Sequence, residues 1–323
     1  MLKHSSGRTF YYGKGDVLVY RTYAAPLEVA AVPESPFTGN SNVIFAHNLK
    51  FAVSGDALLS SFTEGDNTLV VATDSMKNFL LRNAAEFEGS TTEGLLFFLA
   101  SRFMERYPHI TGIEISGDRL PFQSLDVPGP DGFVPSGLVF RHSHNDHAGA
   151  GLELVRSSSG GAGLVSGWSG LTDLQLIKVS GSSFFGFVRD EYTTLPDSYD
   201  RPLFIYLNIF WKYANPDHAM DASLGAYVAA EQVSDIAHTV FYEEKSPSIQ
   251  YLIWLIGRRL LTRFPQLAEV SFESNNRTWE TIVDPADSGS PGVFTEPRPP
   301  YGFQGFTVTR EDLETEAPAA GGE

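Results

Sequence analysis

The chain has no cysteine among its 323 residues. This absence excludes disulfides, thiolate nucleophiles, iron–sulfur clusters and zinc sites built from cysteine. Any chemistry must therefore use oxygen and nitrogen groups. Long apolar runs are also missing, since no stretch reaches the roughly 20 apolar residues that cross a bilayer. We expect no membrane association, and residues 1–8 do not have the pattern of a signal peptide.

Positive charge is scarce, because 23 Lys and Arg stand against 39 Asp and Glu, a formal net charge of −16. Nucleic-acid binding requires basic patches that release counterions from phosphates, so this balance argues against a nucleic-acid surface. A small anion can still bind where one Arg or Lys overrides the overall field. The chain ends in Gly321-Gly322-Glu323 without a peroxisomal address, and a cytoplasmic location is the simplest expectation.

Two helical patterns are repeated along the chain. Residues 92–107 carry apolar side chains at helical spacing, follow a capping-box pattern of Ser90 and Glu93, and stop at Pro108. Residues 248–264 repeat the pattern and stop at Pro265. Here Ser246 and Pro247 are expected to be the N-cap and the first-turn proline.

The offset between the two stops is 265 − 108 = 157 residues, and at that offset the amphipathic stretch 74–87 matches 230–244. Each half therefore contains two consecutive helices. Alternating patterns predict two strands before and two strands after each helix pair. These strands cover residues 10–23, 42–54, 110–116 and 137–155 in the first half, and 174–180, 203–213, 267–274 and 305–310 in the second.

The predicted fold class is therefore α+β, an antiparallel ββααββ module repeated twice. We place the first module at residues 8–160, the second at 168–312, and an acidic, disordered tail at 313–323. Each four-stranded sheet would have open edges, and closure by a partner subunit is the natural remedy.

Four short segments place polar groups at the ends of predicted elements, namely 12–15, 72–78, 184–195 and 248–250. Two of them, at Thr73-Asp74 and Ile249-Gln250, begin helices. There, free backbone N–H groups and the positive end of the helix dipole suit a planar anion.

Each of these residues taken singly also has an ordinary structural reading. Thr73-Asp74 is typical of plain helix capping. Lys14 is typical of a solvated hairpin lysine, and Arg201 of a surface partner for a neighbouring aspartate, Asp200 or Asp197. The combination and order of the segments favour a shared site.

In order along the chain, these segments resemble the urate oxidase family. The matching motifs are YGK at 12–14, VATDSxKN at 71–78, FxGFxRDxYTTL at 184–195, the arginine at 201, SxQ at 248–250 and RPPYG at 298–302. The resemblance covers nearly the whole chain. It implies the tandem tunnelling fold (T-fold) and a homotetramer whose subunits close a β-barrel, with active sites between subunits.

The resemblance also implies the roles of individual residues. Arg201 would pair bidentately with one edge of urate, and Gln250 would hold the opposite edge through its amide. Phe184 would stack on the purine plane, and Asn276 would contact O2 or water above it. The in-plane hydrogen bonds would be completed by the backbone at Ile249 and by Thr73 and Asp74 of the neighbouring subunit.

Lys14 and Thr73 would form the proton relay of the implied reaction. That reaction is the oxidation of urate by O2 and water to 5-hydroxyisourate and hydrogen peroxide, without a metal or a cofactor. The electron-rich urate dianion can itself give electrons to O2. The protein would remove a proton, hold the anion flat and keep room for O2.

One position departs from the family's pattern, which has Asn-x-His on the strand after the last helix. Ungapped spacing from Gln250 places Asn276 on the family's asparagine and Thr278 on its histidine. We expect the Thr278 hydroxyl, through a bound water, to replace the histidine. An alignment shifted by one residue, with Asn275 as the contact and Arg277 in the relay, stays open.

Two other functions stay open as alternatives. His142, His144 and His147 could belong to a zinc-dependent enzyme that acts on pterins, as other tunnelling-fold families do, although such a cluster is usually solvated. The chain could also be a urate- or purine-binding protein without turnover. The presence of both Lys14 and Thr73 favours the enzyme.

Overall fold

A computed structural model describes residues 7–144, 146–158, 160–277, 280–284, 290–295 and 298–314. The architecture is one eight-stranded antiparallel sheet in the order β1-β4-β5-β8-β9-β10-β11-β14. The strands are β1 (Tyr12–Thr22), β4 (Ile44–Ser54), β5 (Gly112–Arg119), β8 (His147–Arg156), β9 (Ala162–Phe184), β10 (Ser198–Tyr213), β11 (Leu267–Arg277) and β14 (Tyr301–Thr309).

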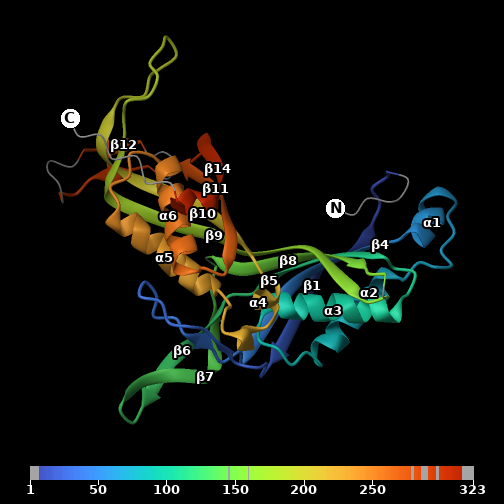
Figure 1. The fold of residues 1–323 in the computed structure, drawn as a ribbon. Coiled ribbons are helices and arrows are strands. Elements are labelled where there is room, and N and C mark those ends of the chain that lie inside the picture. The colour runs from blue at the N-terminus through green and yellow to red at the C-terminus, as the bar shows by residue number, and fades with distance from the viewer. Residues whose placement is uncertain are drawn as a thin grey trace.

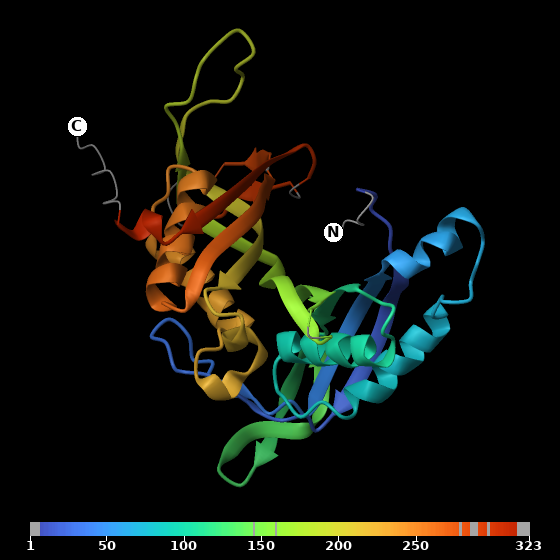
Figure 2. The ribbon, with the colours of Figure 1, turned by 45° about the vertical axis from the view of Figure 1, so that its right-hand side comes forward.

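Two pairs of helices cover this sheet. The pair α2 (Thr73–Ala84) and α3 (Thr92–Arg106) packs on the first four strands, and the pair α5 (Ala230–Glu243) and α6 (Ile249–Arg263) packs on the last four (Figures 1 and 2). The α+β class and the repeated ββααββ order are confirmed. No helix in the described ranges is long and apolar enough to cross a membrane.

The expectation of two separate four-stranded sheets is wrong. Strand β8 pairs along its length with residues 162–172 of β9, so the two halves share one sheet whose edges are β1 and β14. The predicted strand 137–155 is also two strands, since β7 (Gly132–His142) turns back on β6 (Phe122–Gly129) as a projecting hairpin before β8 begins (Figure 2).

Short elements complete the described chain. They are β2 (Leu27–Glu28), β3 (Gly39–Asn40), η1 (Asp56–Leu58), α1 (Leu59–Thr63), α4 (Asp217–Met220), η2 (Ala222–Leu224), β12 (Thr281–Val283), β13 (Val293–Phe294) and α7 (Glu311–Glu314). Helix α7 includes the first two residues of the predicted tail, where Leu313 packs on the second core and Asp312 accepts the Thr309 N–H at 2.8 Å. Residues 315–323 of the predicted tail lie outside the described residues.

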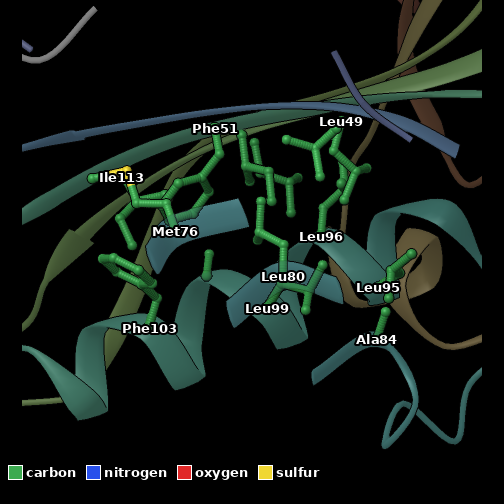
Figure 3. Close-up of a cluster of buried hydrophobic side chains, with 14 of the residues drawn as sticks. Leu49, Phe51, Met76, Leu80, Ala84, Leu95, Leu96, Leu99, Phe103 and Ile113 are labelled. Carbon is green, nitrogen blue, oxygen red and sulfur yellow. The ribbon is translucent and has the colours of Figure 1, made fainter. Parts of the chain in front are cut away.

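Each half of the sheet has its own apolar core. Phe51 of β4 meets Phe103 of α3 with ring centroids 4.8 Å apart, and Met76 and Leu80 of α2 fill the space beside them (Figure 3). A second cluster, from β9, β10, β11, β14, α5 and α6, lies under the other helix pair. The buried residues of the two clusters fall within the expected modules, whose boundaries stay a prediction.

Each of the four long helices ends beside a cation, from a strand or directly after one, that donates to carbonyls in its last turn or just beyond it. The pairs are Arg21 with Ala84 and Phe87, Arg156 with Met104, Tyr107 and Ile110, Lys178 with Phe241, Tyr242 and Glu244, and Arg310 with Leu261, Phe264 and Leu267. The helix ends are thereby fixed against the strands.

Both predicted N-caps are wrong by one or two residues. Thr91, and not Ser90, accepts the Gly94 N–H at 3.1 Å, because Glu93 is buried and accepts hydrogen bonds from other side chains. Ser248, and not Ser246, caps α6 by accepting the Tyr251 N–H at 3.2 Å.

Candidate functional site

A small cavity of about 210 Å³ lies between the strands of the second half and the N-terminus of α6. Five of the predicted substrate-binding residues line it, Phe184, Arg201, Ile249, Gln250 and Asn276. The other lining residues are Ser183, Leu195, Leu203, Ser248 and Gln304. The sequence motifs thus predicted five of the ten residues that line this cavity.

Arg201 brings a partly buried positive charge to this cavity from β10. Its Nε is buried and has no hydrogen-bond partner among the described residues. Burial lowers the pKa of Arg201, which means that the guanidinium has lost solvent without gaining a counter-ion. The ordinary reading of Arg201 as a surface partner is not what the structure shows, since Asp197 pairs with Arg189 and Asp200 accepts the Gly181 N–H.

Phe184 provides a flat apolar surface at the end of β9. Its ring stacks on Phe187 at 5.0 Å with an interplanar angle of 13°, and the Arg201 guanidinium lies 5.5 Å from its centroid. Phe187 belongs to the connection between β9 and β10, in which Gly186 adopts a positive φ of 74° that favours glycine. The motif at 184–195 is thus a folded loop that supports one aromatic ring.

The N-terminus of α6 forms the polar side of the cavity. Ser248 caps the helix, so Ile249 and Gln250 lie in the first turn, where backbone N–H groups have no intrahelical acceptor. The Ser246 carbonyl accepts the Ser183 N–H at 3.2 Å, which fixes the start of α6 next to the end of β9. This junction suits an anion or a polar ring edge.

Asn276 of β11 lies in the cavity wall, whereas Asn275 does not. Asn276 Oδ1 accepts a hydrogen bond from Gln304 Nε2 at 3.3 Å. Arg277 points to the other face, where its guanidinium lies 4.5 Å from the ring centroid of Tyr206. The geometry thus favours the ungapped alignment over the shifted one. Thr278 lies outside the described residues.

Lys14, Thr73 and Asp74 form a second cluster, separate from this cavity. Lys14 is exposed on edge strand β1, and Thr73 and Asp74 begin α2, which packs on β1. Hydrogen bonding and charge from Lys77, and to a smaller extent the charge of Lys14, lower the pKa of Asp74. Lys14 and Thr73 therefore lie on neighbouring elements, as the predicted relay requires.

The site residues are thus divided between two ends of one sheet. The cavity uses β9, β10, β11, β14 and α6, whereas Lys14 lies on β1 at the opposite edge. None of Lys14, Thr73 and Asp74 lines the cavity of the same chain. Each chain therefore presents two different parts of the predicted site.

The histidine segment brings two rings together. The His142 and His144 centroids lie 5.1 Å apart, while His147 Nε2 contacts Thr172 Oγ1 at 2.9 Å. In the part of the chain that the structure describes, no three His, Cys, Asp or Glu residues are grouped so that they could hold a metal ion. The geometry thus gives no support to the zinc alternative.

Gln304 is the main wall residue that sequence analysis missed. It belongs to no quoted motif, since it lies two residues beyond the RPPYG segment. Only the register of β14 on β11, which pairs Gln304 with Ser274, brings it beside the cavity.

Two ββααββ modules are joined in one sheet, and the predicted site residues are divided between the two halves of that sheet. This arrangement defines an α+β protein of the tunnelling-fold class. A family model described as Uricase matches residues 11–148 and 168–304, and the chain belongs to the uricase family. The family expected from the sequence motifs is confirmed.

Individual relatives agree with this assignment. The chain is 50% identical to the uricase of Haloferax volcanii over 94% of its own length and 99% of the relative's. It superposes on the crystal structure of a uricase from Bacillus fastidious with a TM-score of 0.92, 52% identity and 95% coverage of both chains. It is also 52% identical, over 98% of its length, to the uric acid degradation bifunctional protein of Bacillus sp. strain TB-90, and spans 63% of that relative's length.

Proposed function

We propose that this chain is a urate oxidase, which converts urate, O2 and water into 5-hydroxyisourate and hydrogen peroxide. The observation that carries the proposal is Arg201, whose buried Nε has no hydrogen-bond partner in the described part of the chain, in a cavity that Gln250 and Phe184 also line. These residues occupy the positions that the family motifs assign to urate binding. The Haloferax volcanii relative, which this chain matches over nearly its whole length, is named a uricase, and that name supports the same activity.

The shape of the cavity suits a small, flat anion. Its volume of about 210 Å³ is below the ~300–1,000 Å³ of sites for drug-sized ligands. Arg201 can pair bidentately with one edge of a purine, and the Gln250 amide can both donate to and accept from the other edge. Phe184, supported by Phe187, would stack on the ring plane.

The active site would be completed by a neighbouring subunit of a homotetramer. A lone chain holds the binding cavity and the Lys14–Thr73 pair at opposite edges of its sheet. Edge strands β1 and β14 each present backbone groups that a second copy can cover. Thr73 and Asp74 would then bring the first turn of α2, with its free N–H groups, to the urate of another chain.

The proposed chemistry divides between proton removal and oxygen reduction. Lys14, acting through Thr73, would take a proton from urate, while Arg201 and Gln250 hold the resulting dianion in place. The dianion gives two electrons to O2 near Asn276, and O2 takes up two protons to become hydrogen peroxide. Addition of water to the oxidised ring gives 5-hydroxyisourate. Thr278 as the substitute for the relay histidine stays part of this proposal.

The direct test mixes the purified protein with urate in air and follows the ultraviolet band of urate, oxygen consumption and peroxide. We expect one O2 consumed and one peroxide formed per urate, with no change in chelator. Urate binding without oxygen consumption would instead identify a purine-binding protein. We also propose that the protein acts in the cytoplasm, which fractionation of the source cells would test.

A further inference from the structure

Three side chains form a hydrogen-bonded chain that ends at the cavity. Ser274 Oγ donates to Gln304 Oε1 at 3.0 Å, and Gln304 Nε2 donates to Asn276 Oδ1 at 3.3 Å. Ser274 is 4% exposed, so the start of the chain is shielded from water. Gln304 and Asn276 both line the cavity.

The register of two strands creates this contact. Ser274 lies opposite Gln304, and Asn276 lies opposite Gly302. Gln304 therefore reaches Asn276 along the diagonal between neighbouring pairs, a distance that a long side chain can span. Gly302 keeps the space clear, since a Cβ there would lie 3.0 Å from Asn276 Oδ1. A larger residue at 302 would make the Asn276 amide shift to give room.

With Gln304 Nε2 as the donor, the contact determines which end of the Asn276 amide is available to a ligand. An amide has one accepting oxygen and one donating NH2 group, and turning it over exchanges the two. Gln304 occupies Oδ1, and no residue in the described ranges accepts a hydrogen bond from Asn276 Nδ2, so its hydrogens can donate in the cavity. Without Gln304, either end of the amide could face the ligand.

We infer that Gln304 is a positioning residue that makes Asn276 a hydrogen-bond donor to the oxygen co-substrate. The inference rests on the proposed function. Two electrons from the urate dianion place negative charge on O2 before two protons arrive and peroxide forms. A fixed N–H donor stabilises that charge, whereas a carbonyl oxygen in the same place would repel it. Gln304 thus acts on the oxygen half of the reaction and leaves urate binding to other residues.

Gln304→Glu tests this orientation with almost no change in shape. A carboxylate can only accept, so it would take the Asn276 NH2 group and turn the carbonyl toward the cavity. We expect kcat/KM for O2 to fall about 10- to 100-fold, since loss of one donor to a developing oxyanion costs up to about 10³-fold. Because the new carboxylate also adds negative charge to an anion site, the KM for urate is compared in the uncharged variant Gln304→Met, where it should stay within about twofold of the wild type.

Two companion variants separate positioning from simple structural support. Gln304→Met keeps the length but removes both hydrogen bonds, and we expect a smaller defect because Asn276 can then adopt either orientation. In an Asn276→Ala background, Gln304→Glu should add almost no further loss, since the residue through which it acts is gone. Thermal unfolding and anaerobic urate binding of every variant confirm that the fold and the binding site are intact.

The pH profile provides an independent readout. When the carboxyl introduced by Gln304→Glu is protonated, it can donate its O–H to Asn276 Oδ1 and restore the original orientation. The defect of Gln304→Glu relative to the wild type should therefore shrink as pH falls through the titration of that carboxyl. Equal kcat/KM for O2 in the wild type and Gln304→Glu, or full additivity with Asn276→Ala, would overturn the inference. Absence of urate turnover in the wild type would instead overturn the proposed function.

Discussion

The Tyr12 hydroxyl accepts a hydrogen bond from the backbone N–H of Val71 at 2.9 Å. Tyr12 lies two residues before Lys14 on β1, and Val71 lies two residues before Thr73 at the start of α2. This bond therefore joins the two segments that carry the proposed proton relay. Gly13, between Tyr12 and Lys14, allows β1 to approach the Phe51 carbonyl of β4 closely, because a Cβ at this position would lie 1.8 Å from that oxygen.

Tyr12→Phe should disturb the relay more than substrate binding. Loss of the hydroxyl leaves the buried Val71 N–H without its acceptor, which costs about 1–3 kcal/mol in the free energy of unfolding. We expect kcat to fall about tenfold, because a small displacement of reacting groups is costly, while the KM for urate stays almost constant. Steady-state kinetics check this, with exposed Tyr11→Phe as the matched control. A rise in KM alone would contradict the link.

Removal of a helix-terminal cation should destabilise the fold without a direct effect on the site. Arg156 donates to the carbonyls of Met104, Tyr107 and Ile110 at the end of α3. Arg156→Met should lower the free energy of unfolding by about 2–3 kcal/mol, since several bonds from a charged donor are lost. Urea unfolding at a fixed protein concentration measures this. The exposed Arg141→Met is the control, and equal stability of the two variants would contradict the account.

The buried carboxyl of Glu93 should make stability depend on pH. Burial raises the pKa of Glu93 from 4.5 to about 7, despite hydrogen bonds from Ser169 and Tyr227. A raised carboxyl pKa means that the folded chain holds more protons than the unfolded chain between these two values. The contribution of Glu93 to the free energy of unfolding is therefore fully present below about pH 4.5. It falls by about 3 kcal/mol as the pH rises to about 7.

Glu93→Gln provides the comparison for this prediction. The amide keeps a hydrogen-bonding side chain of the same size but cannot ionise. The variant should gain stability relative to the wild type as pH rises from 4.5 to 7, and the gain should level off above pH 7. Unfolding midpoints across this range measure the difference. A difference that does not change with pH would show that Glu93 does not titrate there.

The local periodicity of the sequence predicted much of the fold. The helix predicted at 92–107 is α3, Thr92–Arg106, because its apolar residues recur every three or four positions and Pro108 ends it. Its cap was misplaced because Ser90, Thr91 and Thr92 are all good capping residues, and only the tertiary position of Glu93 selects Thr91.

Long-range pairing could not be predicted in the same way. The β8–β9 ladder that joins the two halves depends on contacts between modules, which no local pattern encodes. The β6–β7 hairpin was missed because Pro128, Gly129 and Pro135 lower the strand propensity of its residues. In the site, Arg201 and Gln250 were found through family motifs, whereas Gln304 depends on strand register alone.

The measurement that tests the central claim most directly is complementation between two inactive variants. Lys14→Met removes the proposed relay residue on edge strand β1, and Arg201→Gln removes the proposed urate-binding guanidinium on β10, in the other half of the sheet. If every site takes Lys14 from one chain and Arg201 from another, an equal mixture assembled together contains some sites with both intact residues. We expect about a quarter of the wild-type urate oxidation in that mixture. At each site, about one in four random pairings of chains brings an intact Lys14 to an intact Arg201. A mixture no more active than the separately assembled variants would contradict the shared site.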